Sequence, residues 1–487
     1  MTDEQKELTP DAFIAAHEAE VNKRWYPRFH IAPRVGWCND PNGFAYFGGQ
    51  YHFFYQYYPY EPKWGPMHWA HATSKDLVHW QRQPVALFPD HPYDADGCFT
   101  GSGIEKDGKL YLLYTGHVDL LKKPGQPDRI ETQNLAVSVD GIHFEKSEKN
   151  PVIKLPQNVS TGEDHHFRDP KVWREGDDWY LVVGSRVGDT GQVRLYRSRD
   201  LREWQDEGIL AEAKEGMGFM WECPDFFMLD GKRVLMFSPQ GMAAEGYRNR
   251  NLFQSGYLVG DWQPGQPFVP DGEFIEMDHG HDFYAPQSFL TPDGRRIVIG
   301  WLDMWESPMP EQRDGWAGML SLPREIRLGA DNRLRMTPAE EVATLRGSYY
   351  PLLAQHLKNQ SSPIVGDAEA IELDLVWDMN SATAESYGIA LGEGLRIYVD
   401  AQAQRLVLER RYPHLMLEGS RSVPLPATDR LSLRIFIDRS SVEVFVNDGD
   451  ACLSSRIYPQ DDQRQLCMFA NHGTATLNSG GYWPLDK

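Results

Sequence analysis

The sequence has few cysteines, no long apolar run and fewer basic than acidic residues. Its five cysteines (Cys38, Cys98, Cys223, Cys452 and Cys467) are odd in number, widely spaced and form no CxxC pair. This pattern argues against a disulfide framework and a zinc site, and it predicts reduced thiols in a cytoplasmic protein. No stretch approaches the roughly 18 apolar residues of a membrane-spanning helix. The polar, acidic N-terminal segment shows neither the basic nor the apolar part of a secretory signal.

Basic residues number 49 against 70 acidic ones, which gives a formal net charge of −21. A surface of this sign repels phosphate backbones and anionic lipids, so we expect no nucleic-acid partner and no membrane partner. The motifs GxGxxG, GxxxxGK[ST], GxSxG and DxDxDG are also absent, which argues against dinucleotide, phosphate-loop, serine-nucleophile and calcium sites. The adjacent His165 and His166 would point apart in a strand, which disfavours a shared metal. We therefore expect neither a cofactor nor a metal.

Turn-forming and aromatic residues are plentiful. The 487 residues include 43 glycines and 33 prolines, and aromatics make up 12% of the chain. Together these features predict an all-β protein with many short strands. The length predicts two or three domains.

A pattern of two apolar strands around a tight turn occurs five times. The copies cover residues 44–56, 102–116, 170–185, 224–239 and 287–301, and their turn residues Gly49, Gly108, Asp177, Gly231 and Gly294 follow one another at intervals of 54 to 69 residues. Each interval leaves room for two further strands, which is typical of four-stranded propeller blades. We predict a five-bladed β-propeller over residues 27–335; the alternative is one long sandwich with coincidental hairpins.

Two short helices and a second β domain flank the predicted propeller. Thr9 and Pro10 can begin a helix over residues 9–24 in an N-terminal extension of residues 1–26. Thr337 can cap a second helix over 337–347, in a linker of residues 336–351. From residue 352 to 487, apolar and polar residues alternate, which predicts a β-sandwich packed on the propeller flank. Within it, residues 438–441 are expected to form a hairpin turn.

Three acidic residues precede the repeated turns by nearly the same distance. Asp40, Asp169 and Glu222 lie nine, eight and nine residues before their turn residues. The same offset falls on residues 99–100 and 284–285 in the other two copies. Since the first strand of a blade is the innermost, all five segments should meet just ahead of that strand, at one mouth of the channel. We expect a funnel with three carboxylates, although Asp-Pro is also an ordinary turn sequence.

Carboxylates in a neutral, aromatic-lined funnel suit glycosidic-bond cleavage. One carboxylic acid protonates the leaving oxygen while another carboxylate attacks the anomeric carbon or activates water. We expect Asp40 and Asp169 to disfavour the ionised form of Glu222 and so help it to hold a proton.

Several sequence blocks resemble glycoside hydrolase family 32. The blocks are GWCNDPNGF (36–44), FRDPKVW (167–173) and MWECPDFF (220–227), with further similarity at 64–80, 96–102, 236–242, 281–287 and 438–449. The resemblance implies a five-bladed propeller followed by a β-sandwich. It also implies that Asp40 is the nucleophile, Glu222 the general acid and base, and Asp169 the residue that binds fructose hydroxyls. Residues implied in substrate binding are Asn39, Gln56, Trp64, Phe99, Thr100, Arg168, Tyr284 and Trp301. Cys38 departs from the apolar residue usual before Asn39, which implies altered packing.

The activity implied is that of a cytoplasmic β-fructofuranosidase of the bacterial invertase group, which hydrolyses the terminal β-D-fructofuranoside of sucrose with retention through a fructosyl-enzyme intermediate. Alternatives within the family are hydrolysis of sucrose 6-phosphate, and hydrolysis or fructosyl transfer on short fructo-oligosaccharides. More distant alternatives are an inverting arabinan- or xylan-type propeller hydrolase and a sugar-binding protein without catalytic activity.

Overall fold

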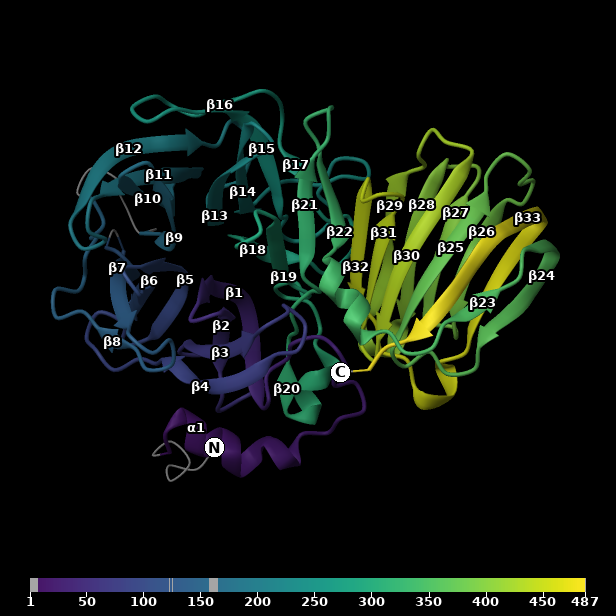
Figure 1. Cartoon of the computed structure of the whole chain (residues 1–487), viewed down its shortest axis with the longest axis horizontal. Coiled ribbons are helices and arrows are strands. Elements are labelled where there is room, and N and C mark those ends of the chain that lie inside the picture. Colours follow the sequence, from purple (N-terminus) through teal and green to yellow (C-terminus); the bar gives the residue numbers. More distant parts are fainter. Residues whose placement is uncertain (1–7, 122, 125, 157–164, 487) are drawn as a thin grey trace.

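The computed structural model describes residues 8–486 apart from 122, 125 and 157–164. Figure 1 shows two lobes, with five small sheets around an axis in one and a set of long strands in the other. Strands make up most of the described chain, and its helices are short.

The N-terminal lobe is a five-bladed propeller, as the repeat predicted. The blades are β1 (Gly36–Phe47), β2 (Gln50–Tyr58), β3 (His68–Ser74) and β4 (Gln81–Leu87); β5 (Gly97–Lys106), β6 (Lys109–Asp119), β7 (Arg129–Ser138) and β8 (Glu145–Lys146); β9 (Phe167–Glu175), β10 (Asp178–Val187), β11 (Thr190–Ser198) and β12 (Trp204–Glu212); β13 (Met220–Leu229), β14 (Lys232–Gln240), β15 (Gly256–Asp261), β16 (Val269–Pro270) and β17 (Ile275–Glu276); and β18 (Tyr284–Leu290), β19 (Arg296–Trp301), β21 (Arg324–Leu328) and β22 (Leu334–Pro338). The innermost strands β1, β5, β9, β13 and β18 contact one another in a closed ring. A short strand, β20 (Trp316–Ala317), pairs in parallel with β1 and ties the end of the propeller to its beginning.

Every inner strand carries a β-bulge at the same place. Two residues there face one residue of the second strand, and the pairs are Asn39–Asp40, Phe99–Thr100, Asp169–Pro170, Cys223–Pro224 and Ala285–Pro286. The first bulge residue of the last three blades has a left-handed φ, +73° at Asp169 and +50° at both Cys223 and Ala285. The expectation that the acids precede the first strand was wrong, because the strands continue through these positions. A bulge bends its strand and redirects its side chains, which turns these residues towards the axis.

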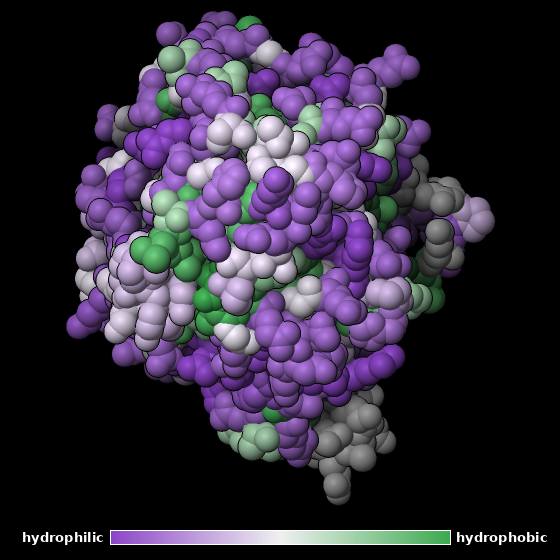
Figure 2. Space-filling model, turned by 90° about the vertical axis from the view of Figure 1, so that its right-hand side faces the viewer, coloured by the Kyte–Doolittle hydropathy of each residue, from purple (hydrophilic) through white to green (hydrophobic). Residues whose placement is uncertain are grey.

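The C-terminal lobe confirms the predicted sandwich. Its strands are β23 (Tyr350–Leu352), β24 (Gln355–Val365), β25 (Ile371–Asp378), β26 (Ser386–Leu391), β27 (Leu395–Asp400), β28 (Arg405–Tyr412), β29 (Leu417–Pro424), β30 (Arg430–Asp438), β31 (Ser441–Val446), β32 (Ala451–Arg456) and β33 (Leu466–Pro484). The long β33 pairs with β26 through its first half and with β25 through its second half, so that it joins two groups of strands. Asp438 pairs with Ser441, which confirms the hairpin turn predicted there. Figure 2 shows a mostly hydrophilic face on this lobe, with a smaller hydrophobic area near its centre.

The helices are shorter than predicted. Helix α1 (Pro10–His17) begins after Thr9, whose side chain accepts a hydrogen bond from the Ala12 amide, and ends in the 3-10 turn η2 (Glu18–Glu20). It stops short of residue 24 because Asn22 donates its amide to the carbonyl of Asp314 instead. The linker helix is the 3-10 helix η4 (Glu340–Leu345). Thr337 does not cap it, because Thr337 lies in β22 and pairs with β21. Further 3-10 turns are η3 (Pro310–Asp314), η5 (Pro413–Leu415) and η6 (Asp461–Gln463).

Buried ion pairs join the two lobes. The His30 ring lies between Asp438, at 2.8 Å, and Glu443, at 2.7 Å. Arg324 contacts Glu443 at 2.6 Å and Asp278 at 2.8 Å. Burial opposes the charge on His30, but the two carboxylates raise its pKa to about 9. The sandwich therefore packs on the propeller flank through charges that are paired across the interface. Within the described residues, no helix has the length and apolar character that crossing a membrane requires.

Candidate active site

A cavity of about 370 Å³ opens at the propeller mouth where the bulges meet. Its lining residues are Asn39, Asp40, Gln56, Trp64, Phe99, Thr100, His117, Asp119, Arg129, Arg168, Asp169, Glu222, Gln240, Phe253, Trp305 and Glu306. Nine of the eleven residues expected at the site are among them, and the other two, Tyr284 and Trp301, lie behind the wall. The fold thus gathers side chains that are far apart in the sequence.

The three acids occupy consecutive places around the bulge. Glu222 stands just before the bulge of its strand, Asp169 is the first bulge residue of β9, and Asp40 is the second bulge residue of β1. Since each place aims its side chain differently, three inner strands can present carboxylates to one cavity from three directions.

Asp40 is held by neutral hydrogen-bonding groups. The Thr100 hydroxyl donates to Oδ2 over 2.6 Å, the Asn39 amide donates to Oδ1 over 3.1 Å, and the Cys223 Sγ lies 3.4 Å from Oδ2. Burial and the nearby Glu222 raise the pKa of Asp40 to about 6, against an ordinary value of 3.8. Near neutral pH, Asp40 is therefore mostly an ionised carboxylate, and it forms no ion pair with any of the described residues.

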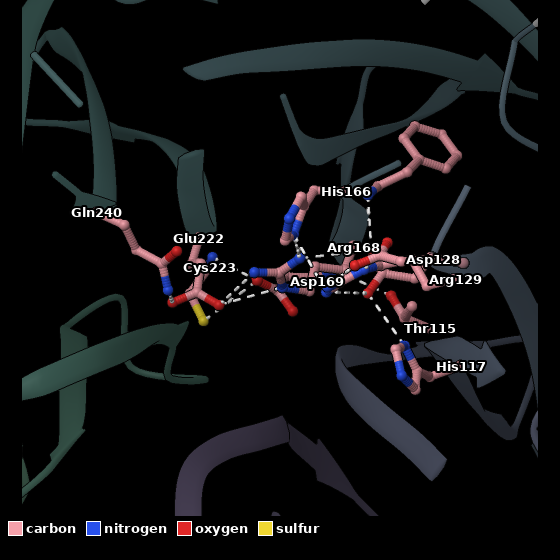
Figure 3. A network of polar contacts seen from close by, with 12 residues as sticks. Thr115, His117, Asp128, Arg129, His166, Arg168, Asp169, Glu222, Cys223 and Gln240 are labelled. Carbon is pink, nitrogen blue, oxygen red and sulfur yellow. Dashed lines mark hydrogen bonds and ion pairs between the residues drawn. The ribbon is translucent and has the colours of Figure 1, made fainter. Parts of the chain in front are cut away.

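Glu222 has a different environment. The Arg168 guanidinium donates to Oε1 through Nε at 3.1 Å and through NH2 at 2.8 Å. The Gln240 amide donates to Oε2 over 2.9 Å, and the Tyr284 hydroxyl donates to the same oxygen. Figure 3 shows Arg168 and Gln240 approaching Glu222 from opposite sides. Arg168 was expected to bind substrate, and its contact with Glu222 was not predicted from the sequence.

Asp169 lies beside Glu222 and is tied to the backbone. Its Oδ2 accepts the Cys223 amide over 2.8 Å, and its own amide donates to the Thr115 hydroxyl over 3.0 Å. Burial and the neighbouring carboxylates raise the pKa of Asp169 well above its usual range, although Arg168 opposes the rise. Burial likewise raises the pKa of the Cys223 thiol, so the thiol is neutral and can donate to either acid.

Aromatic side chains form the walls. Phe99 stacks on the His117 ring with 4.1 Å between centroids and 9° between planes, and it meets the half-exposed Trp64 edge to face. Trp301 was expected in the wall itself, but it is fully buried and lies behind Trp305, 5.0 Å between ring centroids. Flat aromatic faces of this kind pack well against the C–H surfaces of a sugar.

Seven lining residues were not expected: His117, Asp119, Arg129, Gln240, Phe253, Trp305 and Glu306. Gln240 lies in the 236–242 block, which offered a signal. His117 and Asp119 end β6, and Arg129 begins β7. Their place at the mouth depends on the pairing of β6 with β5 and of β7 with β6, which the offset of the inner strands does not encode.

One group of possible metal ligands lies among the described residues, outside the cavity lining. It comprises Asp90, His91 and Asp94. The Lys146 ammonium already contacts Asp94 at 2.7 Å and also contacts Asp90. A cationic side chain therefore supplies the positive charge at this cluster.

Paired carboxylates that face one cavity are the arrangement that glycosidic-bond cleavage requires. Residues 30–338 match the model of the glycosyl hydrolases family 32 N-terminal domain, and residues 341–484 match the model of the family 32 C-terminal domain. The chain belongs to glycoside hydrolase family 32, which confirms the resemblance seen in the sequence.

Similar proteins include two from Escherichia coli. A sucrose-6-phosphate hydrolase is 51% identical over the whole of both chains. A raffinose invertase is 53% identical over 96% of each. Among solved structures, a Bombyx mori GH32 beta-fructofuranosidase mutant in complex with sucrose has a TM-score of 0.85 at 36% identity, covering 100% of this chain and 99% of that one.

Proposed function

We propose that this protein is a β-fructofuranosidase that hydrolyses sucrose to glucose and fructose with retention of anomeric configuration. The observation that carries the proposal is the contrast between two carboxylates in one cavity. Among the described residues, Asp40 is hydrogen-bonded by neutral groups, whereas Glu222 is bound by a guanidinium, a phenol and an amide. Two carboxyl groups with different environments can divide the roles of nucleophile and acid.

In the first step, an ionised Asp40 oxygen attacks the anomeric C2 of the fructosyl unit. The C2–O bond to glucose breaks, its electron pair goes to the glycosidic oxygen, and protonated Glu222 donates its proton to that oxygen. Glucose leaves, and the fructosyl unit remains as an ester on Asp40. The pKa of about 6 keeps Asp40 mostly ionised near neutral pH while leaving it more basic than an exposed aspartate.

In the second step, water attacks C2 of the ester. Glu222, now ionised, takes a proton from the water, and the ester bond breaks to regenerate the Asp40 carboxylate and free fructose. Asp169 has one oxygen fixed by the Cys223 amide, which leaves the other for fructose hydroxyls. These hydrogen bonds would strengthen as positive charge develops on the ring.

Free sucrose is proposed as the preferred substrate over sucrose 6-phosphate. Asp119 and Glu306 lie on the cavity lining, and the Asp119 side chain is 69% exposed. Arg129, also on the lining, is occupied by two hydrogen bonds of 2.9 Å to Asp128. Among the described lining residues, a phosphate would thus meet carboxylates and paired arginines rather than a free cation. Hydrolysis or transfer on short fructo-oligosaccharides uses the same fructose pocket and is the second candidate.

The direct test is release of fructose by the purified protein from sucrose, sucrose 6-phosphate and kestose. We expect the highest kcat/KM with sucrose. Fructose release from sucrose 6-phosphate alone would refute the preference for free sucrose, and no fructose release from any of the three would refute the proposal in favour of a sugar-binding protein. The match to family 32 leaves the arabinan- or xylan-type alternative without support. A cytoplasmic location is part of the proposal and is supported by the five cysteines, which are all free thiols.

A further inference from the structure

A buried carboxylate that does not line the cavity stands directly behind Arg168. Glu131 lies on β7 with its side chain fully buried. Its Oε2 accepts the Phe167 amide over 2.7 Å and lies 3.4 Å from NH1 of Arg168. Its Oε1 lies 3.1 Å from Nδ1 of His117. Glu131 therefore contacts both the cation that binds Glu222 and a ring of the cavity wall.

The Arg168 guanidinium is shared between two carboxylates on opposite sides. Its Nε and NH2 face Glu222, while NH1 faces Glu131 and the ring of His166 (Figure 3). Burial opposes the charges on both partners, but Arg168 and His117 hold the pKa of Glu131 well below its usual range. Glu131 is thus an anion that offsets part of the positive charge facing Glu222.

Among the described residues, six titratable groups surround Glu131 and Arg168. The titratable groups around Glu131 and Arg168 are His117 from β6, Asp128 just before β7, Arg129 from β7, His166 before β9, Asp169 from β9 and Glu222 from β13. Arg129 is neutralised by its two hydrogen bonds to Asp128 and reaches Glu131 only at 4.0 Å. One oxygen of Asp169 accepts a hydrogen bond from the Cys223 amide. Glu131 is therefore the carboxylate that binds NH1 of Arg168, the nitrogen that faces away from Glu222.

We propose that Glu131 is a positioning residue for the hydrolysis described above, on which this inference rests. It fixes the orientation of the Arg168 guanidinium, and its negative charge offsets part of the positive charge that Arg168 presents to Glu222. Because a guanidinium is planar, a hydrogen bond that fixes NH1 also fixes the plane of Nε and NH2. Glu131 also contacts His117, which stacks on Phe99 and lies 3.0 Å from Asp119. Glu131 therefore also fixes the cavity wall beside the catalytic groups.

The test is Glu131→Gln, which keeps the shape and removes the charge. We expect kcat on sucrose to fall about 10- to 100-fold, a part of the 10²- to 10⁴-fold that a positioned acid supplies. KM should change less than about threefold, because the lost group does not touch the substrate. With one negative charge fewer near the site, both limbs of the pH profile should move to lower pH, the basic limb by about one unit.

Two further variants make the outcome decisive. Glu131→Asp keeps the charge but shortens the reach to Arg168, so kcat should fall while the limbs of the pH profile stay in place. Glu372→Gln is the matched control, because Glu372 is also fully buried and paired with arginines, Arg346 and Arg434, but lies in the sandwich. We expect it to change thermal stability and leave the pH profile unchanged.

The outcomes separate this inference from the proposed function. A wild-type protein that does not cleave sucrose would refute the function itself. An active wild type with an unshifted pH profile in Glu131→Gln would overturn only the positioning role. If Glu131→Gln does not fold, an unchanged kcat in Glu131→Asp would overturn it as well, because the shorter side chain cannot hold the 3.4 Å contact to Arg168.

Discussion

The Thr100 hydroxyl donates a hydrogen bond of 2.6 Å to Oδ2 of Asp40 and so links the inner strands of two neighbouring blades. Both residues are the second of the two bulge residues on their strands. Repetition of one bulge around the propeller thus brings a hydroxyl to a carboxylate 60 residues away in the sequence. This contact favours the ionised form of Asp40, which the proposed attack on fructose requires.

Thr100→Val should therefore weaken the nucleophile by protonation. Loss of the hydrogen bond raises the pKa of Asp40 further above about 6, so the acidic limb of kcat/KM should move to higher pH. Thr100→Ser keeps the hydroxyl and serves as the control. A pH–rate profile that is the same for the Val and Ser variants would contradict this role.

Asp40→Asn should abolish most of the activity and stabilise the fold. We expect kcat to fall by roughly 10⁴-fold or more, because the asparagine amide cannot attack C2 to form the ester. The folded-state pKa of about 6 exceeds the ordinary 3.8, so burial of ionised Asp40 costs stability above pH 6 and costs little below pH 4. The variant should gain roughly 1–3 kcal/mol in the free energy of unfolding at pH 8. Denaturant unfolding at pH 8 and pH 4 checks this, and an equal gain at both would contradict it.

Tyr284→Phe removes the phenol that binds the second oxygen of Glu222. We expect kcat to fall about tenfold with little change in KM, because the ring remains buried and only the orientation of the acid suffers. Steady-state kinetics with sucrose measures the changes in kcat and KM separately. A rise in KM with an unchanged kcat would mean that Tyr284 acts on the substrate instead.

Asp119→Asn combined with Glu306→Gln tests the charge of the cavity mouth. Removal of two negative charges should raise kcat/KM for sucrose 6-phosphate several-fold, and by about tenfold at low salt, while sucrose changes little. Parallel assays of the two substrates at two ionic strengths measure this. If the ratio of the two kcat/KM values does not change, substrate choice is set elsewhere.

The contacts of His30 with Asp438 and Glu443 should make the stability of the interface between the lobes fall at alkaline pH. Protonated His30 stabilises the folded state fully below its unfolded pKa of about 6.5, and this contribution is lost as the pH rises through its folded pKa of about 9. Thermal melts from pH 6 to 10 should show a loss of stability that His30→Gln lacks. A wild type and variant with parallel curves would contradict this.

The three acids could be predicted because the repeat placed them at matched offsets, and the five blades followed from the same spacing. The bulges could not be predicted, because a bulge is defined by how an inner strand pairs with its neighbour. For the same reason the contacts from Arg168 to Glu222 and from Glu131 to Arg168 were missed, since each joins strands that the sequence separates by tens of residues. Trp301 was misplaced because its side chain is covered by Trp305 in the folded chain.

The stereochemistry of the first product distinguishes a fructosyl ester on Asp40 from direct attack by water. Sucrose labelled with ¹³C at C2 of the fructosyl unit can be hydrolysed while NMR spectra are recorded within the first turnovers. Attack by Asp40 followed by attack of water inverts C2 twice, so β-D-fructofuranose should appear first and the other forms should grow in by mutarotation. If α-D-fructofuranose appeared first, water would attack directly and Asp40 could not be the nucleophile.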